Sequence, residues 1–109
     1  MRFTRRPGFA KYGNKRTVVD GITFHSKREA NRWQELRLLQ RAGKIALLRR
    51  QVRFKLAVNG VVIGCYVADF TYIEHGRLVV EDSKGMRLDL YKWKAQHFAA
   101  QYGFAIREV

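Results

Sequence analysis

The sequence VADFTYIEHGRLVVEDSKG, residues 67–85, decides the fold that we expect, because it contains two strands and the turn that joins them. Its apolar runs favour β-strands, and His75-Gly76 between them is typical of a tight hairpin loop, in which glycine tolerates a positive φ. If Glu74 pairs with Arg77, this loop sets the register of the whole strand pair. The stretch therefore predicts an antiparallel hairpin whose facing residues can be derived from the sequence.

Acidic residues face each other in this predicted register. Asp69 on the first strand lies opposite Asp82 on the second, and Lys84 points to the same side as Asp82 because side chains alternate along a strand. Two carboxylates directly across a strand pair lie about 4.5–5.5 Å apart and repel each other. We therefore interpret the pair as a divalent-metal site with a lysine beside it. A loop one residue longer would place Glu81 opposite Asp69, which makes Glu81 the alternative ligand.

The residues around this hairpin predict one α/β domain, residues 20–109, in which a mixed β-sheet is flanked by two main helices. We expect the first strand of the hairpin to be central in the sheet and covered on each side, because it is apolar on both faces. The predicted elements are, in order, a short hairpin at Val18 to Phe24, a helix at 27–42, strands at Ile45 to Leu48, Val52 to Val58, Val61 to Ile73 and Leu78 to Lys84, a helix at 89–102 that Gly103 ends, and a last strand at Phe104 to Glu108.

Glu29 in the first predicted helix has two candidate roles. Ser26 and Glu29 have the spacing of a capping box, with Ser26 as the N-cap. Glu29, Trp33 and Leu36 also recur at helical spacing, so Glu29 shares the face that packs inward, where it could reach the acidic pair. A capping glutamate needs no metal, and both roles stay open from the sequence.

The positive charge of the chain is its most unusual bulk property. Of 109 residues, 22 are Lys or Arg and 9 are Asp or Glu, which gives a net charge of +13. Nucleic acid is the polyanion that best neutralises such an excess. A ribosome-like or membrane-surface role would also explain the charge, but neither would explain the acidic pair. We expect residues 1–19 to form a flexible basic arm that contacts phosphates through Arg5, Arg6, Lys11, Lys15 and Arg16; the alternative is a solvated terminus. We expect Lys94 on the second helix to contact phosphate as well; the alternative is a solvated lysine.

Several classes of protein are excluded by simple counts. Cys65 is the only cysteine, so the chain has no disulfide framework and no cysteine zinc site, and the histidines share no ligand spacing. No apolar stretch approaches the roughly 18 residues of a membrane span, and no apolar region follows Arg5 and Arg6 as in a signal peptide. We expect a cytoplasmic protein that does not act on a membrane.

The acidic hairpin resembles a known signature. Asp69, followed on the next strand by Asp82-Ser83-Lys84, resembles the PD-(D/E)XK motif of restriction-endonuclease-like nucleases. Ala68 occupies the position of the proline of that motif, which is often replaced by another residue. The helix of Phe24-x-Ser26-x-x-Glu29 is similar to the first helix of that fold. From Lys11 to Val109 the chain resembles a small, largely uncharacterised phage and prophage family of such proteins.

The resemblance implies a restriction-endonuclease-like core and hydrolysis of DNA with Mg²⁺ or Mn²⁺. It implies that Asp69 and Asp82 are direct metal ligands, that the backbone carbonyl of Ser83 is a further ligand, and that Glu29 binds directly or through water. Lys84 would orient the attacking water or stabilise charge on the phosphate, since an amine with a pKa of about 10.4 is a poor base at neutral pH.

These expectations lead to a metal-dependent DNA endonuclease encoded by a phage or prophage. By analogy, branched recombination DNA is a fitting substrate, and a homodimer would supply two active sites for cutting both strands. RNA in place of DNA stays open. The alternative is a non-catalytic nucleic-acid-binding module that uses only its basic surface, and a third hypothesis is an interaction protein that mimics or blocks a nucleic-acid-binding partner.

Overall fold

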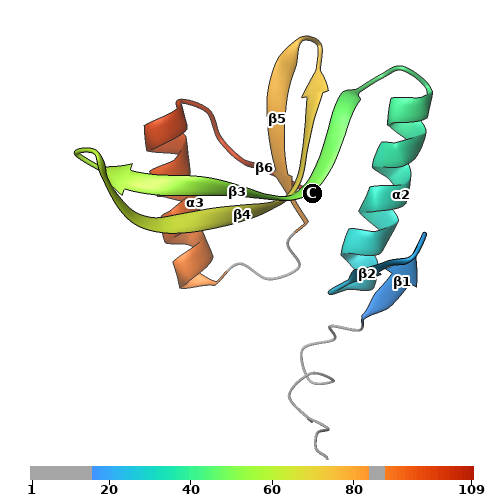
Figure 1. The fold of residues 1–109 in the computed structure, drawn as a ribbon, viewed down its shortest axis with the longest axis horizontal. Helices are drawn as coiled ribbons and strands as arrows, with labels where there is room; N and C mark the ends of the chain where they lie inside the picture. The colour runs from blue at the N-terminus through green and yellow to red at the C-terminus, as the bar shows by residue number, and fades with distance from the viewer. Residues whose placement is uncertain (1–15, 84–87) are drawn as a thin grey trace, which may run out of the picture.

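The computed structural model describes residues 16–83 and 88–109, and in this part it confirms the predicted mixed α/β fold (Figure 1). A two-stranded sheet pairs β1 with β2, and a four-stranded sheet has the order β3-β4-β5-β6. Its pairs are antiparallel except β5 with β6, which is parallel, so the sheet is mixed. The elements are β1 (Thr17–Val19), β2 (Ile22–Phe24), α2 (Lys27–Arg41), β3 (Ala46–Val58), β4 (Val61–Glu74), β5 (Arg77–Asp82), α3 (Asp89–Tyr102) and β6 (Arg107–Glu108).

The predicted two-residue turns are confirmed by their backbone angles. Asp20 and Gly21 have φ of 53° and 76°, Asn59 and Gly60 have 50° and 81°, and His75 and Gly76 have 52° and 75°. Positive φ at both central residues is the turn that matches the twist of a hairpin. The pairing next to each turn therefore follows from a dipeptide in the sequence, although the register of the β3–β4 pair shifts between Leu56 and Ala57.

Helix α2 packs against β3 and, through its aromatic contacts, against the second half of β4. Its N-terminus is capped by Ser26, whose Oγ accepts a hydrogen bond of 3.1 Å from the backbone N of Glu29. On its inward face Leu36 is buried and Trp33 stacks on Phe70 with ring centroids 6.1 Å apart, which confirms the predicted core role of Trp33. This helix buries a first cluster that comprises Phe24, Ala30, Leu36, Ile45, Phe70 and Tyr72.

Helix α3 packs at the other end of β3 and β4, near the turn of their hairpin (Figure 1). It ends as predicted at Gly103, which has a left-handed φ of 86°. Phe98 is fully buried and meets Phe54 edge-on with centroids 5.1 Å apart. The second cluster comprises Leu56, Tyr66, Ala68, Val80 and Phe98. Trp93 on α3 is 76% exposed.

The predicted strands differ from the observed ones in two places. A single strand, β3, replaces the separate strands expected at 45–48 and 52–58, and Leu47 and Gln51 within it have positive φ of 55° and 54°. Leu47 lies at a register shift between Ala46 and Arg49, as in a β-bulge, whereas the pairing keeps its register across Gln51. The last strand, β6, is limited to residues 107–108, because the chain from Gly103 joins β5 only opposite Glu81 and Asp82.

The expectation that β4 is covered along both faces is wrong for its first residues. Val61, Val62 and Ile63 are 63%, 55% and 61% exposed. They follow the Asn59-Gly60 turn, where the β3–β4 hairpin extends away from the rest of the sheet (Figure 1). A strand end that projects beyond its helices has no layer to cover it, even when its sequence is apolar on both faces.

Candidate active site

The β4–β5 hairpin brings Asp69 to the end of β5, as the sequence predicts. The register runs from Glu74 opposite Arg77 to Phe70 opposite Glu81, and one further step places Asp69 opposite Asp82. The backbone N of Ser83 donates a hydrogen bond of 2.9 Å to Oδ2 of Asp69, which ties this carboxylate to the chain directly after Asp82. The alternative register, with Glu81 opposite Asp69, is not adopted.

Asp82 is a fully buried carboxylate that points toward the second hydrophobic cluster. Its Oδ2 accepts a hydrogen bond from the hydroxyl of Tyr66, which is itself buried. Burial, and then the hydrogen bond to Asp82, raise the pKa of the Tyr66 phenol far above its ordinary value. Tyr66 is therefore a neutral, permanent donor that fixes the orientation of Asp82.

Glu81, the neighbour of Asp82, has a different set of partners. It is also fully buried, and its carboxylate accepts hydrogen bonds from Nε of Arg32 at 2.6 Å and Nη2 of Arg32 at 2.9 Å. The hydroxyl of Tyr72 donates a third, at 2.5 Å. The hydrogen bond to Glu81 raises the pKa of the Arg32 guanidinium despite its partial burial. Glu81 is thus held in an ion pair with α2, while Asp82 lies beside Asp69.

Glu29 is buried near the bend of β3. Its Oε1 accepts a hydrogen bond of 3.3 Å from the backbone N of His25, and its Oε2 accepts one of 3.1 Å from Nε2 of Gln51. The capping box is therefore modified, because the glutamate bonds to the residue before the N-cap Ser26. Nothing in the sequence marks Gln51, which lies between Arg50 and Val52, as a hydrogen-bond partner of a helix residue 22 positions earlier.

Metal binding at this site would rest on oxygen ligands from β4 and β5. Within residues 16–83 and 88–109, no three acidic, histidine or cysteine side chains lie close enough together to hold a metal ion. Asp69 and Asp82 are thus a pair, and Glu29 is not gathered with them into such a group. Carboxylate oxygens are hard ligands of the kind that Mg²⁺ prefers, and this ion usually keeps several waters, so two carboxylates fit its chemistry.

The structure also bears on the other residues predicted to act at the site. Lys84, Arg5, Arg6, Lys11 and Lys15 lie outside the described residues. Arg16 is exposed before β1, and Lys94 is half-buried on α3.

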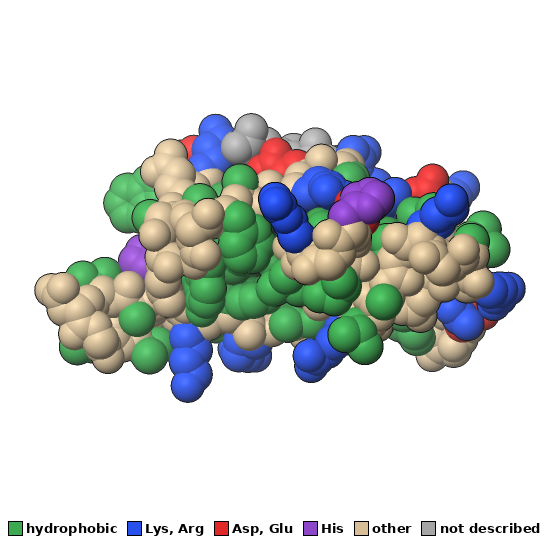
Figure 2. All heavy atoms as spheres, turned by 90° about the horizontal axis from the view of Figure 1, so that it is seen from above, with side chains coloured by type: hydrophobic (Ala, Val, Ile, Leu, Met, Phe, Trp, Pro, Cys, Tyr) green, Lys and Arg blue, Asp and Glu red, His purple; other side chains and the backbone are tan. Residues whose placement is uncertain are grey.

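The surface of the described part is rich in Lys and Arg side chains. Figure 2 shows the end of the molecule that carries the β4–β5 hairpin, with basic side chains spread over it and fewer acidic ones between them. This distribution accords with the count of 22 basic and 9 acidic residues. No helix in the described part of the chain is long and apolar enough to cross a membrane.

The fold and the site together define a small basic α/β domain with two aspartates on adjoining strands. The family model DUF1064, described as a protein of unknown function, matches residues 9–107, and the chain belongs to this family. No curated protein and no solved structure matches the chain.

Proposed function

We propose that this protein is a metal-dependent DNA endonuclease with a restriction-endonuclease-like core of the PD-(D/E)XK type. The observation that carries the proposal is the register of β4 and β5, which puts Asp69 opposite Asp82 at the end of β5. Like charges in facing positions are costly in a strand pair unless a cation lies between them. The motif Asp82-Ser83-Lys84 supplies the lysine that such chemistry requires.

Each residue has a specific task in this proposal. Asp69 and Asp82 bind Mg²⁺ or Mn²⁺, with the backbone carbonyl of Ser83 as a further ligand and Glu29 acting through water. When bound, the metal supplies an acidified water and neutralises charge on the phosphate. Tyr66 holds the Asp82 carboxylate in one orientation. Lys84 positions the attacking water or stabilises the phosphate through its positive charge.

Binding of DNA follows from the basic excess of the chain. Neutralising phosphates releases counterions, which favours binding in proportion to the number of contacts. Arg5, Arg6, Lys11, Lys15 and Arg16 are the proposed contacts from the N-terminal arm, and Lys94 is the proposed contact from α3. We further propose a phage or prophage origin, action in the host cytoplasm on branched DNA, and a homodimer for cutting both strands.

The test is cleavage of plasmid, linear duplex, single-stranded and four-way-junction DNA with Mg²⁺ or Mn²⁺, and with EDTA as the blank. Wild type is compared with Asp82→Asn and Lys84→Ala, and the matched control is Glu81→Gln, which changes the adjacent acid in the same way. We expect metal-dependent cutting that Asp82→Asn and Lys84→Ala abolish and Glu81→Gln retains. Cutting that survives Asp82→Asn would refute the site.

A non-catalytic nucleic-acid-binding module is the second candidate. It is favoured by the finding that Glu29 and Glu81 are both satisfied by protein donors, with no three-acid group in the described residues. This module would bind DNA with a steep salt dependence, cut neither DNA nor RNA, and show the same affinity with and without Mg²⁺. A metal-dependent change in affinity that Asp82→Asn removes would argue against it.

A further inference from the structure

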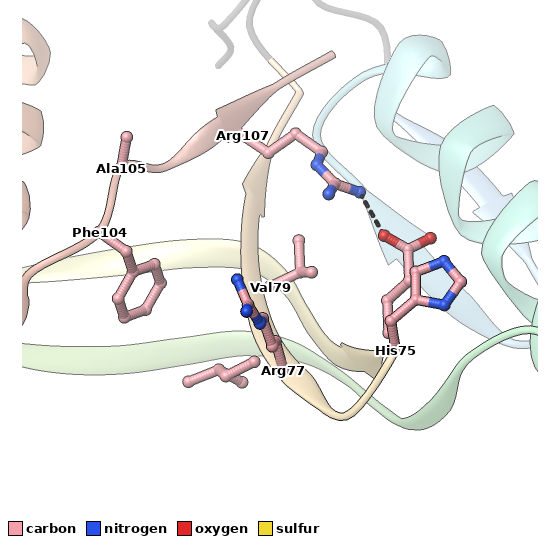
Figure 3. Close-up of a pocket in the computed structure, with 8 residues that line it drawn as sticks. His75, Arg77, Val79, Phe104, Ala105 and Arg107 are labelled. Carbon is pink, nitrogen blue, oxygen red and sulfur yellow. Dashed lines mark hydrogen bonds and ion pairs between the residues drawn. The ribbon is translucent and has the colours of Figure 1, made fainter.

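A concave site lies away from the acidic pair, toward the opposite end of β5. It is a cavity of about 490 Å³ on the side of the β4–β5 hairpin, and the segment that leads from α3 to β6 forms its other wall (Figure 3). Arg77 and Val79 line it from β5, Phe104 and Ala105 line it from that segment, and Arg107 lies at its end. Small-ligand sites typically measure about 300–1,000 Å³.

The cavity exists because β6 is short. Among the described residues, β6 pairs with β5 only at Glu81 and Asp82, so the edge of β5 from Arg77 to Val80 is not paired with β6. The chain after Gly103 starts apart from this edge and approaches it only at Arg107. The walls that remain are an apolar floor from Leu78 and Val79 on one side and the ring of Phe104 on the other.

The charged residues of the cavity favour an anion. Arg107 is pre-oriented, since its Nη1 donates to Oε1 of Glu74 at 3.1 Å and to the hydroxyl of Tyr72 at 3.2 Å. Figure 3 shows its guanidinium turned toward Glu74, with Arg77 between it and Phe104. Arg77 is exposed and forms no ion pair with any residue that the structure describes. Two guanidiniums against one carboxylate leave a net positive charge.

We propose that this cavity binds a nucleotide, with its phosphate on Arg77 and Arg107 and its base against Phe104. Guanidinium groups match the geometry of phosphate oxygens, and an aromatic face stacks on any base. A ligand with both an anionic and a planar apolar part uses both kinds of wall, whereas inorganic phosphate would use only one.

The nucleotide belongs to a DNA strand that the protein binds, and this assignment rests on the proposed function. Arg77 and Asp82 are five positions apart on β5, which corresponds to roughly 17 Å along an extended strand. The cavity would then hold a nucleotide several positions from the bond that is cut. A free mononucleotide offers the same chemistry, and the experiment separates the two sources.

Binding is measured in EDTA, where no cleavage occurs, with full-length protein and four probes: dTMP, thymidine, inorganic phosphate and a fluorescein-labelled dT12. The variants are Arg77→Gln and Phe104→Leu, with Lys55→Gln on β3 as the control of equal charge change at an exposed position. We expect Arg77→Gln to weaken dTMP and dT12 roughly tenfold, as loss of a charged hydrogen bond does. Lys55→Gln should leave dTMP unchanged, and thymidine and phosphate should each bind more weakly than dTMP.

Different outcomes identify different errors. Equal losses for Arg77→Gln and Lys55→Gln would overturn the site, because the binding would then be general charge attraction. Phosphate binding as tightly as dTMP, or no effect of Phe104→Leu in a variant that unfolds like wild type, would overturn the role of the base. Binding of dTMP but not dT12 at this site would refute the strand assignment. Arg77-dependent binding in a protein that cuts no DNA would uphold the nucleotide site and reject the nuclease.

Discussion

The ion pair between Arg32 and Glu81 provides the sharpest test of how the site is organised. Replacing Arg32 with Met removes two of the three hydrogen bonds that the described residues donate to the fully buried Glu81 carboxylate, and leaves the one from the hydroxyl of Tyr72. Removing one partner of a buried pair costs about 3–5 kcal/mol. Because the Arg32 side chain is 22% exposed, water can partly replace it, and we expect a loss of about 3 kcal/mol. That is a large share of the total stability, about 5–15 kcal/mol, of an ordinary domain.

The assay is urea unfolding at pH 7, followed by circular dichroism, of wild type, Arg32→Met, Glu81→Leu and the double variant. The double variant removes both charges together. Its loss of unfolding free energy should therefore be smaller than the sum of the two single losses by at least about 1.5 kcal/mol. Additive losses, or a loss below about 1 kcal/mol for Arg32→Met, would refute a structural ion pair here.

The same pair separates the two neighbouring acids by function. If Glu81 stabilises and Asp82 binds metal, Glu81→Gln lowers the unfolding midpoint in urea and retains metal-dependent cleavage. Asp82→Asn should instead abolish cleavage, and metal should no longer shift the melting temperature of this variant. Loss of cleavage in a folded Glu81→Gln variant would instead make Glu81 the ligand.

Three further predictions concern stability. Burial, and then the hydrogen bond to Glu81, raise the pKa of Tyr72, so the folded state favours the neutral phenol. The stability that this preference supplies is lost as pH rises above about 10. Between pH 10 and 11, the free energy of unfolding of wild type, measured by urea titration, should therefore fall by up to about 1 kcal/mol more than that of Tyr72→Phe. Gly103→Ala should cost about 1 kcal/mol in thermal unfolding, from the left-handed φ of 86° alone, because no described heavy atom lies within 4 Å of the added Cβ. Ser26→Ala should cost about 1 kcal/mol through loss of the helix cap, and Ser26→Asp should restore it.

The features that the sequence predicts correctly are those set by local chemistry. Asp20-Gly21, Asn59-Gly60 and His75-Gly76 adopt the positive φ that their types favour, and each turn then dictates the pairing beside it. The helix ends at Ser26 and Gly103 likewise depend on single residues. The facing positions of the acidic pair could be derived because a two-residue turn leaves one register.

The features that could not be predicted depend on partners far away in the chain. Glu81 and Arg32 are 49 positions apart, and the sequence of a strand carries no sign of which helix will face it. The hydrogen bond between Gln51 and Glu29 has the same origin, since it needs the bend of β3 to meet the start of α2. Exposure of Val61 depends on how far the helices reach, which residue type does not encode.

The choice between Glu81 and Asp82 illustrates how structure resolves what a motif leaves open. Adjacent residues of a strand point to opposite faces, so only one of two neighbouring acids can face Asp69. A buried carboxylate must be compensated, and the two acids use different donors: Glu81 accepts from a guanidinium of α2, and the partners of Asp82 include the hydroxyl of Tyr66. A carboxylate that is already paired with the guanidinium of Arg32 gains little from a cation. In the proposed nuclease the ligand is therefore Asp82 and not Glu81, and DNA would approach β5 from the face that bears Asp69.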